Sequence, residues 1–171
     1  MTVTPLAASP LDDATWQALT GPRPPRPPQA TLVWTAVVDI AERETLGASG
    51  LGERFIVPIL GGRFVGGPGH EALSGRVRAG GADRQLLRAD GVKELRAEYE
   101  IETDDGAVLT IDNRVLLDDR RQPVRYALSN VRVTAPAGPH EWLNRRVFAG
   151  TLDVLRPERA AVLIRVFLLD A

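Results

Sequence analysis

From residue 30 onward the chain consists of short segments in which apolar and polar residues alternate, separated by glycine- and proline-rich turns. Side chains of a β-strand point alternately to its two faces, so this period of two predicts strands with one buried face. Gly61-Gly62 is expected to form one of the turns. The expected strands are 31–40, 53–60, 63–65, 73–78, 84–89, 92–103, 107–117, 124–134, 144–151 and 160–170. This spacing is typical of an all-β antiparallel sandwich or closed barrel.

The clearest element is a hairpin around Asp105-Gly106, a dipeptide typical of tight β-turns. On the inner face of its first strand Tyr99 lies among apolar residues, and on the inner face of its second strand Asn113 does the same. An inward polar group costs free energy unless it is paired. We therefore expect Tyr99 and Asn113 either to be satisfied by neighbours or to contact a ligand.

Two further segments place polar side chains on one strand face. Asp83 and Gln85 share a face just after Gly80-Gly81, where the backbone can bend or bulge. Trp142 and Asn144 share a face near the C-terminus. With the two hairpin residues, these groups could bind and polarise a carbonyl or enol in an apolar pocket. The alternatives are structural: a carboxylate bonded to its own turn, amides closing the barrel ends, and aromatic rings filling the core.

Residues 1–29 form a separate extension, and residues 30–171 form the β domain. Ser9-Pro10 predicts the start of a short helix and Gly21 its end. Residues 22–28 read Pro-Arg-Pro-Pro-Arg-Pro-Pro, which is typical of polyproline II. This Pro-rich linker could bind an SH3-type domain, or it could be a stiff spacer that lays the helix onto the barrel.

The composition excludes several classes of function. The absence of cysteine rules out disulfides and thiolate chemistry, and His70 and His140 are too few for a histidine-rich metal centre. We expect no metal and no cofactor. A net charge of −1 gives no general attraction to nucleic acid or to a membrane. Without a signal-peptide pattern or a long apolar segment, the prediction is a cytoplasmic protein whose partner is a small-molecule ligand.

The last predicted strand, 160–169, is apolar on both faces apart from Arg165. A strand with two apolar faces is expected to bury both of them. Its outer face could meet a second copy of the chain in a homodimer, or it could meet the N-terminal helix.

Several motifs occur in order along the chain. They are Gly52-Glu53-Arg54, Gly61-Gly62-x-Phe64, Gly80-Gly81-Ala82-Asp83-x-Gln85, Asp90-Gly91, Tyr99, Thr103-Asp104-Asp105-Gly106-Ala107, Asn113 and Trp142-Leu143-Asn144. With these motifs the chain resembles the DUF3237 family of uncharacterised proteins, also called UPF0311, over about residues 31–170. The resemblance implies a single antiparallel, calycin-like β-barrel with a central cavity, and it implies little about activity.

The chain departs from the family pattern at three places near these motifs. Arg84 stands where the family has an aromatic residue, and Val115 stands where it has a glycine. Residues 127–129 read Ala-Leu-Ser instead of Phe-Arg-Thr. These changes could retune the pocket, so the substrate of a relative does not transfer to this chain.

The first functional hypothesis is a cofactor-free isomerase, cyclase or lyase/hydratase that acts on an apolar or aromatic metabolite inside the barrel. Asp83 is the expected acid or base, with a pKa raised by burial, and Tyr99 is the second expected catalytic residue. Arg54 is a candidate carboxylate clamp, and Trp142 is a candidate apolar wall. The substrate oxygen would be held by Tyr99, Gln85, Asn113 and Asn144.

Two alternatives remain open. One is a barrel that binds a small molecule without chemistry, which needs the same pocket but no poised titratable group. The other is an interaction module that uses the proline segment or the outer strand faces.

Overall fold

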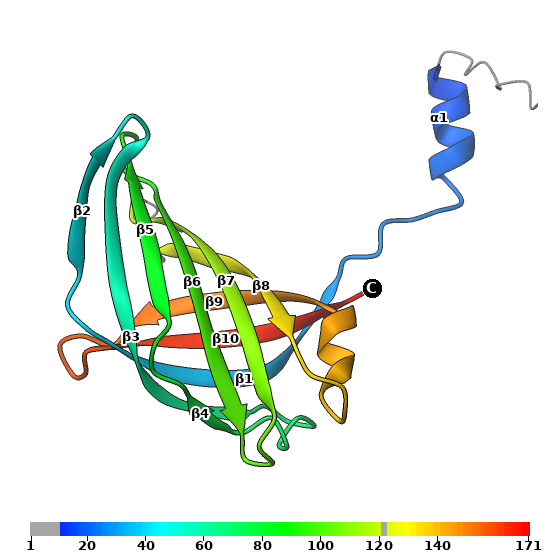
Figure 1. Cartoon of the computed structure of the whole chain (residues 1–171). Helices are drawn as coiled ribbons and strands as arrows, with labels where there is room; N and C mark the ends of the chain where they lie inside the picture. Colours follow the sequence, from blue (N-terminus) through cyan, green and yellow to red (C-terminus); the bar gives the residue numbers. More distant parts are fainter. Residues whose placement is uncertain (1–10, 121–122) are drawn as a thin grey trace, which may run out of the picture.

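The computed structural model describes residues 11–120 and 123–171, which form one short α-helix, one 3₁₀-helix and ten strands (Figure 1). The elements are α1 (Asp13–Thr20), β1 (Gln29–Ile40), β2 (Glu44–Ser49), β3 (Gly52–Gly66), β4 (Gly75–Val77), β5 (Ala82–Arg88), β6 (Lys93–Thr103), β7 (Val108–Asp118), β8 (Tyr126–Thr134), η1 (Glu141–Arg145), β9 (Val147–Val154) and β10 (Ala161–Asp170). Neither described helix has the length and apolar character that a membrane crossing requires.

The sheet closes on itself because β1 pairs with β10 on one side and with β3 on the other. From β10 the order continues through β9, β8, β7 and β6, and the short strands β4 and β5 together occupy the position between β6 and β3. Every pairing is antiparallel, which gives an eight-stranded closed barrel. The predicted all-β antiparallel barrel is therefore confirmed.

The predicted turn at Gly61-Gly62 is wrong, because both glycines lie within the long strand β3. Asp39 pairs with Gly61 while Ile40 pairs with Ile59, so the β1–β3 register shifts at this point. Both glycines have positive φ, 138° and 142°, a conformation that costs little without a Cβ. They bend one continuous strand at a bulge, and β3 pairs with different strands on either side of the bend.

The predicted strand 144–151 is also wrong at its start. Residues Glu141–Arg145 form the 3₁₀-helix η1, and β9 begins only at Val147. Strand β2 was not predicted. All of its residues are exposed, so its sequence shows no alternation of apolar and polar residues. It pairs with β3 and lies beyond the closed wall.

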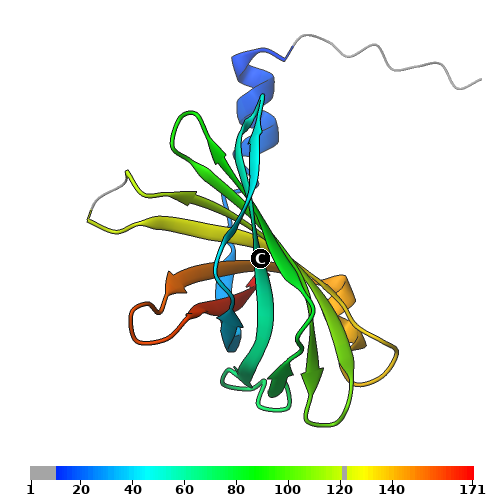
Figure 2. The same cartoon turned by 60° about the vertical axis from the view of Figure 1, so that its left-hand side comes forward.

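The two ends of the barrel differ. The hairpins β2–β3 and β5–β6 project at one end (Figure 2). At the other end η1 and the loop between β3 and β4 form a plug, in which Leu143 and Leu73 are buried. Just inside the plug Trp34 and Phe148 pack with ring centroids 6.1 Å apart. Apolar side chains thus fill the plugged half, and the cavity of the barrel lies toward the other end.

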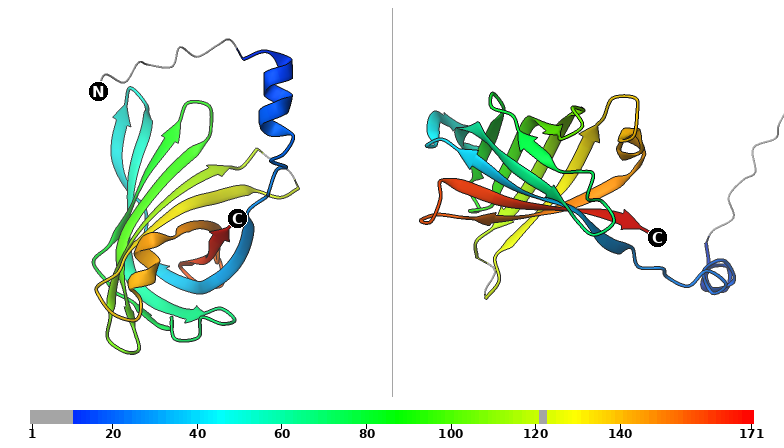
Figure 3. Two further views of the ribbon diagram at one scale, coloured as in Figure 1. Left: turned by 90° about the vertical axis from the view of Figure 1, so that its right-hand side faces the viewer. Right: turned by 90° about the horizontal axis from the view of Figure 1, so that it is seen from below.

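Helix α1 stands clear of the barrel (Figures 1 and 3). Its N-cap is Asp12, whose carboxylate accepts a hydrogen bond of 2.8 Å from the Thr15 backbone N–H. The predicted cap at Ser9-Pro10 falls outside the described residues, whereas the predicted end at Gly21 is confirmed. No residue of α1 is buried, so the expectation that the linker lays the helix onto the barrel is wrong.

Candidate functional site

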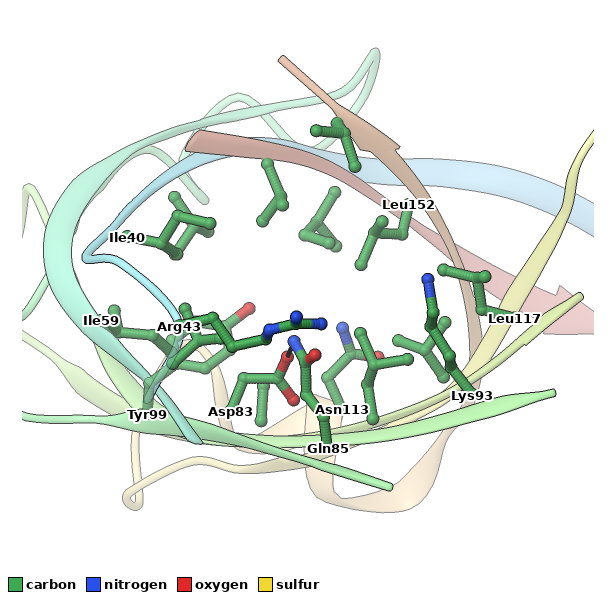
Figure 4. A pocket seen from close by; sticks show the side chains of 18 of the residues that line it. Ile40, Arg43, Ile59, Asp83, Gln85, Lys93, Tyr99, Asn113, Leu117 and Leu152 are labelled. Atoms are coloured by element: carbon green, nitrogen blue, oxygen red, sulfur yellow. Dashed lines mark hydrogen bonds between the residues drawn. The ribbon is translucent and has the colours of Figure 1, made fainter. Parts of the chain in front are cut away.

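A cavity of about 320 Å³ opens at the unplugged end of the barrel (Figure 4). Its wall is mainly aliphatic, as the alternation in the strands predicts. The lining residues are Val38, Ile40, Ala41, Glu42, Arg43, Val57, Ile59, Asp83, Gln85, Lys93, Leu95, Ala97, Tyr99, Asn113, Val115, Leu117, Arg125, Leu152, Val154, Arg156, Val162 and Ile164.

Strand register brings the predicted polar residues together on one side of this cavity. Asp83 of β5 lies opposite Ala97 of β6, and Ala97 lies opposite Asn113 of β7. Neighbouring strands are about 4.8 Å apart, so Asp83 and Asn113 flank a position with a very small side chain. The methyl group of Ala97 leaves room for a ligand between the carboxylate and the amide.

Gln85 fixes the orientation of the Asp83 carboxylate. Its Nε2 donates a hydrogen bond of 2.7 Å to Asp83 Oδ2. The two residues are two positions apart on β5, so both side chains face the cavity and can contact each other. Asp83 Oδ1 is buried and has no hydrogen-bond partner among the described residues. One oxygen is therefore held and the other is available to a ligand.

The pKa of Asp83 is raised to about 6, and the main cause is burial, which disfavours the charged form. The hydrogen bond from Gln85 acts in the opposite direction. The backbone N–H of Arg96 also lowers this pKa, although it does not reach hydrogen-bond geometry. A carboxyl group of this kind can take up or release a proton close to neutral pH.

Tyr99 and Asn113 both reach the cavity from the hairpin that the sequence singled out. Burial raises the pKa of Tyr99, so its hydroxyl stays protonated and can donate a hydrogen bond. The close approach of Gly81 to this residue requires glycine, because a Cβ at position 81 would lie 2.5 Å from Tyr99 Cβ. Asn113 is 2% exposed and its Oδ1 has no partner among the described residues. Its position fits a ligand contact better than a closed structural network.

Trp142 and Asn144 do not line the cavity, which corrects their assignment as substrate-binding residues there. Both belong to η1 in the plug at the opposite end. Trp142 stacks on His70 with ring centroids 5.5 Å apart. Asn144 is exposed and clamps Ala135, accepting from its N–H at 2.8 Å and donating to its carbonyl at 2.9 Å. The two residues were expected on one face of an extended segment, whereas the 3₁₀-helix places them in the plug.

Arg54 is likewise outside the cavity. Its guanidinium donates to the backbone carbonyls of Leu46 and Gly47 at 3.0 and 3.4 Å, which ties β3 to β2. Because side chains alternate on β3, Phe55 and Val57 point inward and Arg54 points outward. The expectation of a carboxylate clamp at Arg54 is therefore wrong for this cavity.

The cations that do line the cavity were missed. Lys93 shares the inward face of β6 with Tyr99, so the same alternation could have found it. Arg43, Arg125 and Arg156 lie in connections at the open end. They come together only when the barrel closes, and no local sequence pattern marks them.

His140 and His70 lie at the plugged end, apart from the cavity. His140 is buried, and its Nε2 lies 3.1 Å from Asp105 Oδ2. This contact ties the plug to the β6–β7 turn. Neither histidine can reach a ligand held beside Asp83.

Comparison with known proteins agrees with this architecture. The model of a family described as "Protein of unknown function (DUF3237)" matches residues 28–169. The chain belongs to this family. A UPF0311 protein of Rhodopseudomonas palustris (strain TIE-1) is 33% identical to this DUF3237 chain over 140 residues, which covers 72% of this chain and 86% of the relative. The family predicted from the motifs is confirmed.

Solved structures share the DUF3237 barrel. A protein of unknown function from Rhodopseudomonas palustris superposes with a TM-score of 0.75 at 31% identity, covering 86% of this chain and 100% of the other. A β-barrel-like protein from Acinetobacter baumannii AYE gives 0.73 at 26% identity, covering 86% and 99%. An enzyme from Penicillium herquei gives 0.68 at 20% identity, covering 86% and 98%, a likeness that shows the fold alone.

Proposed function

We propose that this protein is a cofactor-free enzyme that performs acid–base chemistry on a small apolar or aromatic molecule in the barrel cavity. The observation that carries the proposal is the Asp83 carboxylate in a mainly aliphatic wall: Gln85 holds Oδ2, and Oδ1 is buried without a partner among the described residues. A structural carboxylate at such a site would be expected to have both oxygens satisfied.

In the proposed reaction Asp83 takes a proton from a C–H next to a carbonyl, or from a hydroxyl group of the substrate. The same proton returns to a different carbon, so the atoms and electrons balance within the substrate. Isomerisation and cyclisation by addition of O–H across a double bond fit this scheme. In hydration a water molecule is the co-reactant: Asp83 takes its proton, the oxygen bonds to one carbon of the double bond, and the proton passes to the other carbon. In the reverse reaction Asp83 takes the proton from carbon and passes it to the departing hydroxide, which leaves as water. With a pKa raised to about 6, the carboxyl is a stronger base than an exposed aspartate and still gives the proton back readily.

The developing negative charge on the substrate oxygen needs hydrogen-bond donors. Tyr99 supplies a protonated hydroxyl, and the amide of Asn113 can turn its NH₂ group toward the cavity. Both face the space above Ala97, beside Asp83. The proposed roles are thus proton transfer for Asp83, oxygen binding for Tyr99 and Asn113, and positioning of the carboxylate for Gln85.

The fold supports catalysis in general terms, since a neighbour with the same barrel is described as an enzyme. The second candidate is a barrel that binds a small molecule without changing it. The observation in its favour is the cavity itself, which is open and mostly apolar whether or not Asp83 transfers a proton.

The test compares wild type with Asp83→Asn and with Asp112→Asn as a matched control. Asp112 lies on the outer face of β7, where Arg114 pairs with it at 2.9 Å. Hydroxylated aromatics, enones and small carboxylic acids are first screened for thermal stabilisation. Stabilising compounds are then followed by proton NMR in D₂O, which reports both deuterium uptake at carbon and product formation.

We expect wild type and Asp112→Asn to catalyse exchange or conversion, and Asp83→Asn to be slower by about 10²–10⁴-fold with its fold intact. In wild type the rate should rise as the pH increases through about 6, because Asp83 must be ionised to accept the proton. Binding with no exchange by any of the three proteins would favour the non-catalytic barrel. Full activity in Asp83→Asn would refute the role of Asp83.

A further inference from the structure

The mouth of the cavity carries more cations than carboxylates. Among the described residues that line the cavity, four are cationic, and two, Glu42 and Asp83, carry carboxylates. An anionic molecule is therefore favoured over a cation at this entrance. Most of these cations already have partners: Arg156 pairs with Glu42 at 2.8 Å, and Asp119 pairs with Lys93 at 3.2 Å and with Arg125 at 2.6 Å.

Arg43 differs from the other three cations. It forms no ion pair and no hydrogen bond with any described residue. Its guanidinium carbon lies 4.0 Å from the centroid of the Phe55 ring. Stacking of this kind uses the face of the guanidinium and leaves the N–H groups at its edge free to donate. Arg43 is thus held in place by a contact that does not consume its hydrogen bonds.

The position of this guanidinium relates it to the proposed site. Phe55 lies opposite Gln85 in the β3–β5 register, two residue pairs along from the Val57–Asp83 pair. Figure 4 shows the Arg43 side chain extending into the cavity toward Gln85 and Asn113. Phe55 itself does not line the cavity, whereas Arg43 does. The arginine therefore lies between the ring and the space that a ligand would occupy.

We propose that Arg43 binds a carboxylate group of the ligand, so that the cavity takes a small carboxylic acid with an apolar or aromatic body. The planar fork of donors matches the two oxygens of a carboxylate, and the body of the ligand lies against Leu95, Val115 and Ile164. This deepens the proposed function and rests on it for the chemistry, while the binding step depends only on the cavity.

The test is calorimetric titration with 2-naphthoate and 2-naphthamide, which share a shape and differ in charge. The proteins are wild type, Arg43→Gln and Arg54→Gln. Arg54 is a matched control, since it is an exposed arginine on β3 whose contacts are with β2. Arg43→Lys is included because it keeps the charge and removes the planar fork.

We expect wild type to bind 2-naphthoate at least about tenfold more tightly than 2-naphthamide. Arg43→Gln should bind both equally, with its affinity for the amide unchanged. Arg43→Lys should keep part of the preference, and Arg54→Gln all of it. The proposal is overturned if Arg43→Gln retains the preference, if wild type shows none, or if wild type binds neither probe at about 1 mM.

Turnover by Asp83→Asn, measured beside this titration of the arginine variants, separates this inference from the proposed function. If Asp83 performs no chemistry but Arg43 binds carboxylates, Asp83→Asn converts substrates as wild type does, and the preference still disappears in Arg43→Gln. If the catalytic role is right and the anchor is wrong, Asp83→Asn loses turnover while all arginine variants bind the two probes alike.

Discussion

At the scale of single residues, the environment of Asp83 separates it from the other aspartates of the barrel. Several of them lie beside arginines on the surface, where a hydrogen bond and an opposite charge lower the pKa; Asp112 beside Arg114 is an example. Asp83 lies in an apolar wall, and burial raises its pKa to about 6. An aspartate therefore forms a stabilising ion pair at position 112, whereas at position 83 it can gain or lose a proton near neutral pH.

This difference predicts opposite effects of two asparagine substitutions on stability. The folded state holds the Asp83 proton more tightly than the unfolded chain, so the contribution of Asp83 to stability falls as pH rises from about 4 to 6 and then levels off. Asp83→Asn should be more stable than wild type at pH 8, by up to about 3 kcal/mol, and equal to it near pH 4. Urea unfolding across this range measures the difference.

Asp112→Asn is the control with the opposite sign. Arg114 lowers the pKa of Asp112, so its contribution is present at neutral pH and is lost on acidification. The variant should be less stable than wild type at pH 7, by under about 1 kcal/mol because the pair is partly exposed. A loss of stability in Asp83→Asn at pH 8 would contradict the assignment of a buried, unfavourable charge.

At the scale of elements, β3 depends on glycine for its shape. Its first half pairs with β2 and β5, and its second half pairs with β1 and β4. The change of partners takes place around Gly61 and Gly62, where β1 also approaches closely. A strand with side chains at these positions could not bend there and still close the barrel.

We therefore predict that Gly62→Ala destabilises the barrel by about 3 kcal/mol or more. A Cβ at this position would lie 2.1 Å from the backbone oxygen of Val37, and the φ of +142° is unfavourable for alanine. Gly50→Ala is the control, because nothing lies within 4 Å of its added Cβ. Its effect should be within about 0.5 kcal/mol. Equal free energies of unfolding for the two variants would contradict this account of the bend.

At the scale of the whole molecule, barrel closure produces both the cavity and its charged mouth. Polar residues of β5, β6 and β7 meet on one wall, and cations from separate connections gather at the open end. Helix α1 takes no part in this assembly, since none of its residues is buried. A homodimer through the outer face of β10 and a cytoplasmic location stay predictions.

Deletion of residues 1–28 should leave the melting temperature of the barrel unchanged within about 2 °C. The reason is that α1 buries no side chain and β1 begins at Gln29. Trp34→Ala is the positive control: this side chain is 1% exposed in the core, and its loss should cost about 3–5 kcal/mol. A lower melting temperature after the deletion would show that the helix stabilises the barrel. Light scattering on the same samples tests the homodimer.

By itself the sequence determined most of the strands, an all-β antiparallel architecture and the inward direction of Asp83, Gln85, Tyr99 and Asn113. These follow from the alternation of side chains along an extended backbone, which is a local property of the chain. The tertiary structure decided what local patterns do not encode. It placed Trp142 and Asn144 in the plug at the far end. It also brought the connections at the open end together, so that Arg43, which has no ion pair with any described residue, lies beside the polar wall. Such convergence depends on which distant strands pair, and only closure of the barrel fixes that.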